Sequence, residues 1–246
     1  MSRLSVGEGV GVSGLVPGDP AGDRLVDQLS RRIGSCEDDV IILRYPSRLV
    51  ALADRVAPEN RRVLPAGGLL YWEVRADTYV AAARASGVEI ERFRGGSLSA
   101  SSKKTRALAM LRDSFDGYVN HYAANGLFEP TVVADGYLEW AQNTLLDPSG
   151  IAYILTVDGA VVGAATVSED PELDVHEIEL AAIGAEYQRR GLYRHLLDGI
   201  VAGARADGVD RVVISTQSHN TNVQRAWARA GLVPALAVET AHLVRR

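Results

Sequence analysis

The stretch Gln188-Arg-Arg-Gly-Leu-Tyr193 decides the fold prediction, because it joins an expected strand to an expected helix. Residues 175–183 alternate between side-chain types as a strand does, and residues 192–206 have an apolar face at helical spacing. The first amides of a helix lack intrahelical acceptors and lie at the positive end of its dipole. We therefore expect a pyrophosphate site at this turn, with added charge from Arg189 and Arg190. An ordinary turn with a solvated arginine pair would give the same hexapeptide.

Clear signals flank this turn on both sides. Before it lies a predicted hairpin, residues 153–167, whose Asp158-Gly159 pair is typical of a tight turn. A short helix after it is ended by Gly231. The other elements expected after residue 104 are helices 105–115, 131–145 and 221–230 and strands 209–216 and 235–243.

The first 95 residues predict a smaller α/β unit. Its expected elements are helix 23–34, strand 38–44, helix 47–57 and strand 68–74. The Gly/Ser-rich stretch 96–104 is the expected linker, which divides the chain into domains 1–95 and 105–246. The same order of elements recurs in 192–243, so the N-terminal unit could be a degenerate half-copy of the second. Any α/β chain, however, can produce such an order.

Composition and charge exclude several classes of protein. The 246 residues carry a net charge of −5, which provides no basic field for a nucleic-acid partner. No apolar run reaches the roughly 18 residues needed to cross a bilayer, and the start has no secretory apolar core. The single Cys36 cannot form an intramolecular disulfide, which fits a reducing cytoplasm. Scattered histidines, without HExxH or paired cysteines, predict no metal site.

The order hairpin, strand, Q-x-x-G turn, helix, strand and asparagine-led short helix resembles that of the GNAT acetyltransferases, whose turn reads Q/R-x-x-G-x-G/A. The resemblance covers about residues 105–246. It implies a mixed, mostly antiparallel twisted sheet with flanking helices. It also implies acetyl-CoA as co-substrate and N-acetyl transfer to an amine. The residues that would bind acetyl-CoA by this resemblance are Ile183, Gln188, Arg189, Arg190, Gly191, Leu192, Tyr193, Asn220 and Trp227.

Taken whole, the chain is similar to the TDP-fucosamine acetyltransferase group, which acetylates an amino sugar on a nucleotide. These proteins also carry a smaller α/β region ahead of the acetyltransferase domain. The resemblance implies a small-molecule amine acceptor, most simply a nucleotide-linked amino sugar. An aminoglycoside or protein amine is the alternative acceptor. The N-terminal half could complete the acceptor pocket, form a homodimer contact or stabilise the core.

Two positions depart from the family pattern. Tyr193 stands where the turn usually has a small residue, so the phosphate approach must tolerate a side chain there. Trp227 stands where the family commonly has a tyrosine as general acid, and an indole cannot supply a proton at neutral pH. These departures keep a non-catalytic, acyl-CoA-binding protein open as an alternative.

Two glutamates on the predicted strand 175–183 are candidate general bases. By period-two alternation, Ile178, Leu180 and Ala182 share one face of this strand. Glu177 and Glu179 would then share the opposite face, toward the acceptor. Glu177 comes first, because the resemblance places it where histone acetyltransferases keep their base. Glu179 could equally be a carboxylate on a half-wet strand.

Other titratable residues are weaker candidates. His121 lies in the loop between the first two helices after residue 104, which by the resemblance borders the acceptor. Histidine is a suitable base at neutral pH, although a lone loop histidine is more often simply exposed or packed. Tyr193 or a water could replace the missing tyrosine acid. His176 and His195 are expected at the surface.

Overall fold

The computed structural model describes residues 2–5, 20–95, 97 and 101–246. Their strands form one mixed sheet with the order β1-β2-β9-β3-β8-β7-β6-β5-β4. The strands are β1 (Ser2–Ser5), β2 (Val40–Pro46), β3 (Arg61–Arg75), β4 (Val88–Arg94), β5 (Ile151–Val157), β6 (Ala160–Asp170), β7 (Val175–Ile183), β8 (Arg211–Gln217) and β9 (Val233–Arg245). The helices are α1 (Pro20–Gly34), α2 (Leu52–Val56), α3 (Lys104–Phe115), η3 (His121–Ala124), α4 (Pro130–Leu146), η4 (Ala185–Tyr187), α5 (Leu192–Ala206) and α6 (Thr221–Arg229). Neighbouring strands are antiparallel except β1–β2 and β7–β8.

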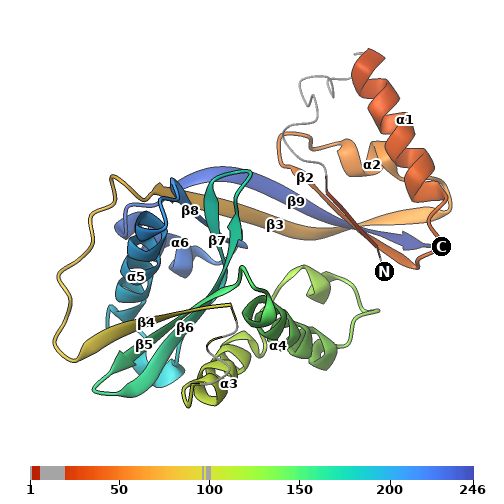
Figure 1. Cartoon of the computed structure of the whole chain (residues 1–246). Helices are drawn as coiled ribbons and strands as arrows, with labels where there is room; N and C mark the ends of the chain where they lie inside the picture. The colour runs from red at the N-terminus through yellow and green to blue at the C-terminus, as the bar shows by residue number, and fades with distance from the viewer. Residues whose placement is uncertain (1, 6–19, 96, 98–100) are drawn as a thin grey trace.

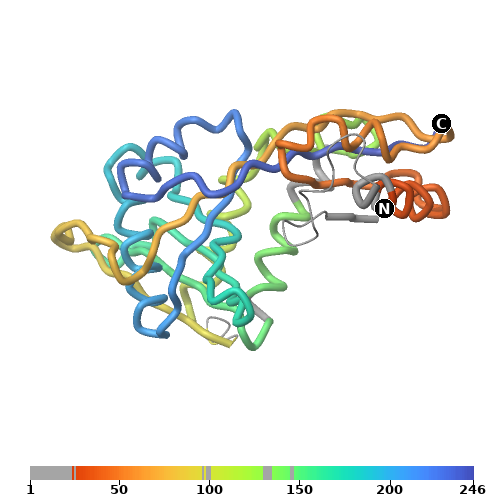
Figure 2. The backbone as a smooth tube through the Cα atoms, turned by 90° about the horizontal axis from the view of Figure 1, so that it is seen from above, coloured from red at the N-terminus to blue at the C-terminus, as the bar shows by residue number. Residues whose placement is uncertain are grey.

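The N-terminal half contributes strands to both ends of this sheet and to its middle. Strand β3 lies between β8 and β9, and β4 adds to the edge beside β5. Figures 1 and 2 both show β3 and β9 running side by side from the main body to the N-terminal helices. The sheet is therefore continuous across the expected linker 96–104, of which residues 96 and 98–100 lie outside the described residues. The division into domains 1–95 and 105–246 stays a prediction.

Helices cover the sheet in three groups, each with its own apolar core. Helix α5 packs over β5 to β8, with Leu196 and Ile200 among its fully buried residues. Helices α3 and α4 cover the opposite face of β5 to β7. The paired strands β2 and β9 form an extension of the sheet beyond the main body. Helices α1 and α2 cover one face of this β2–β9 extension. The other face of this extension looks toward η3, which contacts β3.

A β-bulge in β7 changes which side chains share a face. Thr166 of β6 pairs with Leu180 but Val167 pairs with Ile178, so Glu179 is the extra residue. Ile178 consequently packs in the α5 core, whereas Leu180 packs in the α3–α4 core. The predicted common face of Ile178, Leu180 and Ala182 is therefore wrong. Strict alternation fails at one inserted residue, which the apolar pattern does not reveal.

The expected helix 47–57 is shorter in the structure, where α2 spans Leu52–Val56. Ser47 does not act as a helix cap, because its backbone N–H donates to the Ala237 carbonyl of β9 at 2.8 Å. This bond extends the β2–β9 pairing beyond Pro46. The first residues of the predicted helix are thereby held against the sheet.

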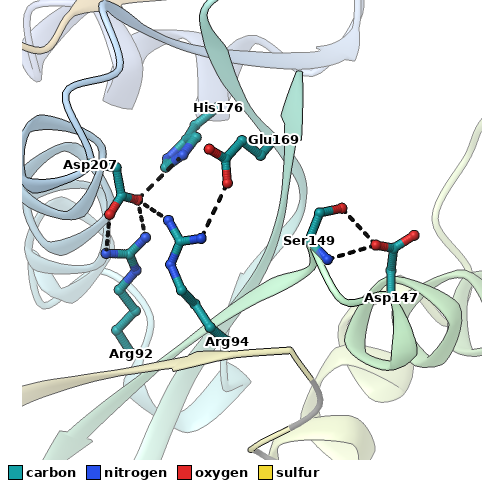
Figure 3. Close-up of polar contacts among 7 residues, drawn as sticks. All are labelled: Arg92, Arg94, Asp147, Ser149, Glu169, His176 and Asp207. Carbon is teal, nitrogen blue, oxygen red and sulfur yellow. Dashed lines mark hydrogen bonds and ion pairs between the residues drawn. The ribbon is translucent and has the colours of Figure 1, made fainter. Parts of the chain in front are cut away.

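A charged cluster joins β4 to the C-terminal end of α5 (Figure 3). Arg92 Nη1 donates to Asp207 Oδ1 at 3.0 Å, and Arg94 bonds both Asp207 and Glu169. His176 Nε2 lies 3.5 Å from Asp207 Oδ2, and its side chain is 0% exposed. The expectation of a surface His176 is wrong, because its ring packs among the side chains of this cluster, next to Asp207 at the end of α5.

Because of this charged cluster, we expect the folded protein to lose stability in mild acid. Burial lowers the pKa of His176 below its ordinary 6.5, so the unfolded chain binds the proton more tightly. Stability contributed by neutral His176 is complete above about pH 6.5 and falls below it, by at most about 1.4 kcal/mol per pH unit. Burial opposes the charge of Asp207, but bonds from Arg92 and Arg94 hold its pKa below the ordinary 3.8, so its contribution disappears only near and below that pH.

Thermal unfolding measured between pH 7.5 and 4.5 checks this prediction. The melting temperature should fall with pH, and a His176→Gln variant should lose part of the slope because it cannot titrate. His219→Gln is the matched control, since His219 is exposed and should leave the slope unchanged. An unaltered slope in His176→Gln would contradict the assignment.

Candidate active site

Strands β7 and β8 separate part-way along their length. Their parallel pairing runs from Val175 beside Arg211 to Ile178 beside Ile214 and then stops. Strand β7 nevertheless continues to Ile183, and β8 continues to Gln217. In the described part of the chain, the edge of β7 that faces β8 has no strand partner after Ile178. We call this separation of the two strands, bordered by β7 amides and carbonyls without a ladder partner on this edge, the opening.

The turn from β7 into α5 lies at the end of this opening. Gly191, the residue before α5, has φ of +78°, and a Cβ built there would meet no atom within 4 Å. Arg189 also has a positive φ, +62°, so the backbone is tightly turned just before the helix. Gln188 Nε2 donates to the Ile183 carbonyl at 3.1 Å, which fixes the turn against the end of β7. Gly191 directly precedes α5, whose first amides lack intrahelical acceptors.

The two positions that depart from the family pattern contact each other. Trp227 of α6 is 1% exposed, and its Nε1 donates to the Tyr193 hydroxyl at 3.0 Å. The Tyr193 side chain is thus directed toward α6 and leaves the approach to Gly191 open. Burial raises the pKa of Tyr193 to about 12, with a smaller opposing effect of the Trp227 bond, so this hydroxyl keeps its proton at neutral pH.

A polar chain borders the opening on the β8 side. Asn220, just before α6, donates from Nδ2 to Thr216 Oγ1 at 3.1 Å. The Tyr118 hydroxyl, from the segment after α3, lies 3.2 Å from the same oxygen. Thr216 lies beyond the point where β8 stops pairing with β7. These contacts place Asn220 beside the end of β8 that no longer pairs with β7. Its role in binding acetyl-CoA stays a prediction.

Glu177 and Glu179 lie close together on the α3–α4 side of β7. Burial raises the pKa of Glu177 above its ordinary 4.5; nearby Glu179 raises it further, while Arg44 opposes the shift. The bulged Glu179 accepts a hydrogen bond from the Thr144 hydroxyl of α4. It lines a recess of about 230 Å³ together with Asn143, Thr144, Asp147, Ser149, Gly150 and Ser168. Figure 3 shows Ser149 donating to Asp147 at this recess.

Residues 115–232 match the model of the acetyltransferase (GNAT) family. This segment contains the separated strands, the 188–193 turn, both glutamates and the Asn220 segment. The segment has the GNAT fold. The predicted α/β GNAT fold is thereby confirmed, and the match supports acetyl transfer in general.

Solved structures share the architecture of the whole chain. A GCN5-related N-acetyltransferase from Sphaerobacter thermophilus has a TM-score of 0.59 at 15% identity, covering 99% of this chain and 74% of that one. One from Kribbella flavida has a TM-score of 0.59 at 17% identity, covering 99% and 80%. A tandem GNAT protein from the clavulanic acid biosynthesis pathway has a TM-score of 0.57 at 12% identity, covering 92% and 70%. At these identities the likeness shows the fold. No curated protein matches the sequence.

His121 is buried rather than exposed in its loop. Its exposed fraction is 5%, and its Nδ1 lies 3.0 Å from Nε2 of His242 on β9. Burial lowers the pKa of His242, and the Arg44 charge lowers it further. A bond between two imidazoles requires one to donate and the other to accept, so the pair is favoured with at least one neutral ring. His121 as a base stays a prediction.

Three further side chains interact electrostatically with one another or with Glu177, and no site role was predicted for them from the sequence. Tyr71 of β3 and Arg44 of β2 come from the N-terminal half, and Tyr137 of α4 accepts a bond from Asn120 at 3.0 Å. A signal for Arg44 exists, because it is the one charged residue within the apolar strand Val40–Pro46. Strand pairing between distant segments, which the sequence does not show, brings it to the site.

In the described ranges, no group of three or more His, Cys, Asp or Glu is placed to hold a metal ion. Among the same residues, no helix combines the length and apolar character needed to span a membrane.

Proposed function

We propose that the chain is an N-acetyltransferase that moves the acetyl group of acetyl-CoA to the amine of a small acceptor. A nucleotide-linked amino sugar is the proposed acceptor. Glu177 is the proposed base and Glu179 the second carboxylate of the site. The observation that carries the proposal is the separation of β7 and β8 after Ile178 and Ile214. The separation begins one residue after Glu177, and β7 then leads into the α5 turn.

The residues present fit acetyl-CoA. The α5 turn offers helix amides, open space at Gly191 and the cationic side chains of Arg189 and Arg190 to a pyrophosphate. The unpaired edge of β7 can hydrogen-bond the amides of an extended pantetheine arm, with Asn220 on the other side. The backbone N–H near Ile183 is the proposed donor to the thioester carbonyl. When bound, acetyl-CoA supplies an activated acetyl group.

The chain's own residues account for the proton transfers. A neutral amine is required for attack, and the carboxylate of Glu177 takes up the proton that the amine loses. The raised pKa of Glu177 makes it a stronger base than an exposed glutamate. An amine of pKa near 8 is already about one-tenth neutral at pH 7, so an amino sugar demands less of this base than lysine does. Tyr193 is the proposed proton donor to the leaving thiolate.

Replacing Tyr193 with phenylalanine tests the donor role. The indole N–H of Trp227 loses its acceptor, and we expect a stability loss of about 1 kcal/mol. If the hydroxyl donates the proton, kcat should fall about 10-fold or more while the Kd for acetyl-CoA is unchanged. Tyr79→Phe is the matched control, because it also removes a buried hydroxyl bonded to α5, through Asp198. Normal turnover in Tyr193→Phe would remove Tyr193 from the mechanism.

Free-thiol release from acetyl-CoA tests the activity itself. The acceptors to screen are nucleotide-linked amino sugars, aminoglycosides and lysine peptides. The acidic recess at Glu179 and Asp147 is the feature that favours the cationic aminoglycosides as the alternative class. Release with any of these acceptors supports the activity, and the preferred one defines the class. Acetyl-CoA binding without release for every acceptor would favour the non-catalytic, acyl-CoA-binding alternative, which the Trp227 and Tyr193 departures keep open.

A further inference from the structure

Arg44 is a partly buried cation that has no hydrogen-bond or ion-pair partner among the described residues. It lies in β2, and its Nε is buried without a hydrogen bond. Within the described part of the chain, no nitrogen of Arg44 forms a hydrogen bond or ion pair. Arg61, by contrast, is also buried, but its terminal nitrogens donate to the carbonyls of Leu243, Cys36 and Asp38. A guanidinium removed from water without compensation is costly, so Arg44 is suited to a partner from outside the chain.

Strand register places Arg44 on the same face of the sheet as Glu177. Arg44 pairs with Thr240 of β9, and Tyr71 pairs with Leu236, four residues along the same strand. Because paired residues share a face and alternate along a strand, Arg44 and Tyr71 lie on one face. Tyr71 also pairs with Ser215 of β8, and Glu177 pairs with Val213, two residues before it. The same face therefore extends from Arg44 to Glu177.

The Arg44 charge acts on several groups of this face. It lowers the pKa of Glu177, although burial and Glu179 outweigh it there. It likewise opposes the effect of burial on the pKa values of Tyr71 and Tyr137. One side of the face thus carries the carboxylates of Glu177 and Glu179, and the other carries a guanidinium. A molecule with an amine and an anionic group complements both sides.

We propose that Arg44 binds an oxyanion of the acceptor, so that the substrate is an amine carrying a carboxylate or a phosphate. The inference rests on the proposed acetyltransferase function and assigns the N-terminal half a part in acceptor binding. The guanidinium can bond two oxygens of either group in one plane. The amine of the same molecule then lies toward Glu177. An acceptor with only cationic groups would leave Arg44 without a partner.

Paired acceptors test this inference. Thiol release from acetyl-CoA is measured with amino acids and their carboxamides, and with amino-sugar phosphates and the unphosphorylated amino sugars. We expect the anionic member of one pair to have a kcat/KM at least about 10-fold higher, mainly through KM. The pair that shows the preference distinguishes a carboxylate from a phosphate.

Arg44→Gln should abolish this preference. At a pH above the acid limb, it should lower kcat/KM for the anionic acceptor about 10- to 30-fold and leave the neutral acceptor and the Kd for acetyl-CoA unchanged. Arg44→Lys should restore part of the loss. Removal of the positive charge should also move the acid limb of the pH–rate profile to higher pH, because Arg44 lowers the pKa of Glu177. Exposed Arg62→Gln is the matched control and should change none of these values.

The outcomes separate the two proposals. Equal turnover of neutral and anionic acceptors, with no effect of Arg44→Gln on either, would overturn the role of Arg44 and leave the acetyltransferase intact. No thiol release with any acceptor, despite acetyl-CoA binding, would overturn the activity and the inference with it. A loss in Arg44→Gln that is equal for both members of a pair would also contradict anion binding, since it indicates a general structural effect.

Discussion

Replacing Glu177 with glutamine should lower kcat/KM for the acceptor by about 100- to 10,000-fold, the range typical for loss of a general base. Glutamine keeps the shape of the side chain but cannot take up the amine proton. The Kd for acetyl-CoA should not change, because Glu177 lies within β7 and not at the α5 turn. Thiol-release kinetics and a separate binding titration measure the two quantities.

Glu179→Gln distinguishes the two carboxylates. Glu179 raises the pKa of Glu177, so its neutralisation should move the acid limb of the pH–rate profile to lower pH and reduce kcat/KM by less than about 10-fold. Because Glu177 acts deprotonated, activity should rise with pH through its raised pKa. A larger loss in Glu179→Gln than in Glu177→Gln would reverse the assignment of the base.

The α5 turn is the second position at which a single substitution should have a large effect. Gly191→Ala should weaken acetyl-CoA binding roughly 100-fold, equivalent to the loss of about two charge-assisted hydrogen bonds. The added Cβ occupies the open space where we place the pyrophosphate, and it strains a backbone whose φ is +78°. That strain alone costs roughly 1 kcal/mol of stability.

Gly208→Ala is the matched control for this change. Gly208 follows the other end of α5, has φ of +77° and also has nothing within 4 Å of a built Cβ. The two variants should lose similar stability in thermal unfolding, but only Gly191→Ala should lose affinity for acetyl-CoA. Equal affinities in isothermal titration would show that the α5 turn does not hold the pyrophosphate.

Local chemistry explains which elements could be predicted from the sequence. The hairpin was predicted because an Asp-Gly pair favours the positive φ values that a tight turn requires. In the structure, Asp158 and Gly159 have φ of 48° and 81°. Strand Val175–Ile183 and helix Leu192–Ala206 have the predicted bounds, since each has a strong period of its own. Strand β4, Val88–Arg94, was missed because four charged residues interrupt the apolar pattern of this edge strand.

The candidate site was predictable only where one segment supplies it. The 188–193 turn is a local motif, so its residues lie together as expected. The Trp227–Tyr193 contact joins two helices, so no local pattern predicts it. Five other residues of the candidate site each come from a different element: His121, His242, Arg44, Tyr71 and Glu177. Period-two alternation also failed at the Glu179 bulge, because one extra residue reverses the faces on either side of it.

The position of β3 between β8 and β9 has a consequence for how the chain folds. The bond from Arg61 to the Leu243 carbonyl joins residues 182 positions apart, and β2 pairs with the same final strand. During synthesis, β2 and β3 therefore leave the ribosome long before their partner β9 exists. Pairing over such sequence separations is slow, because loop-closure entropy precedes any favourable contact. The face that carries Arg44 and Tyr71 is completed only when β9 has been made.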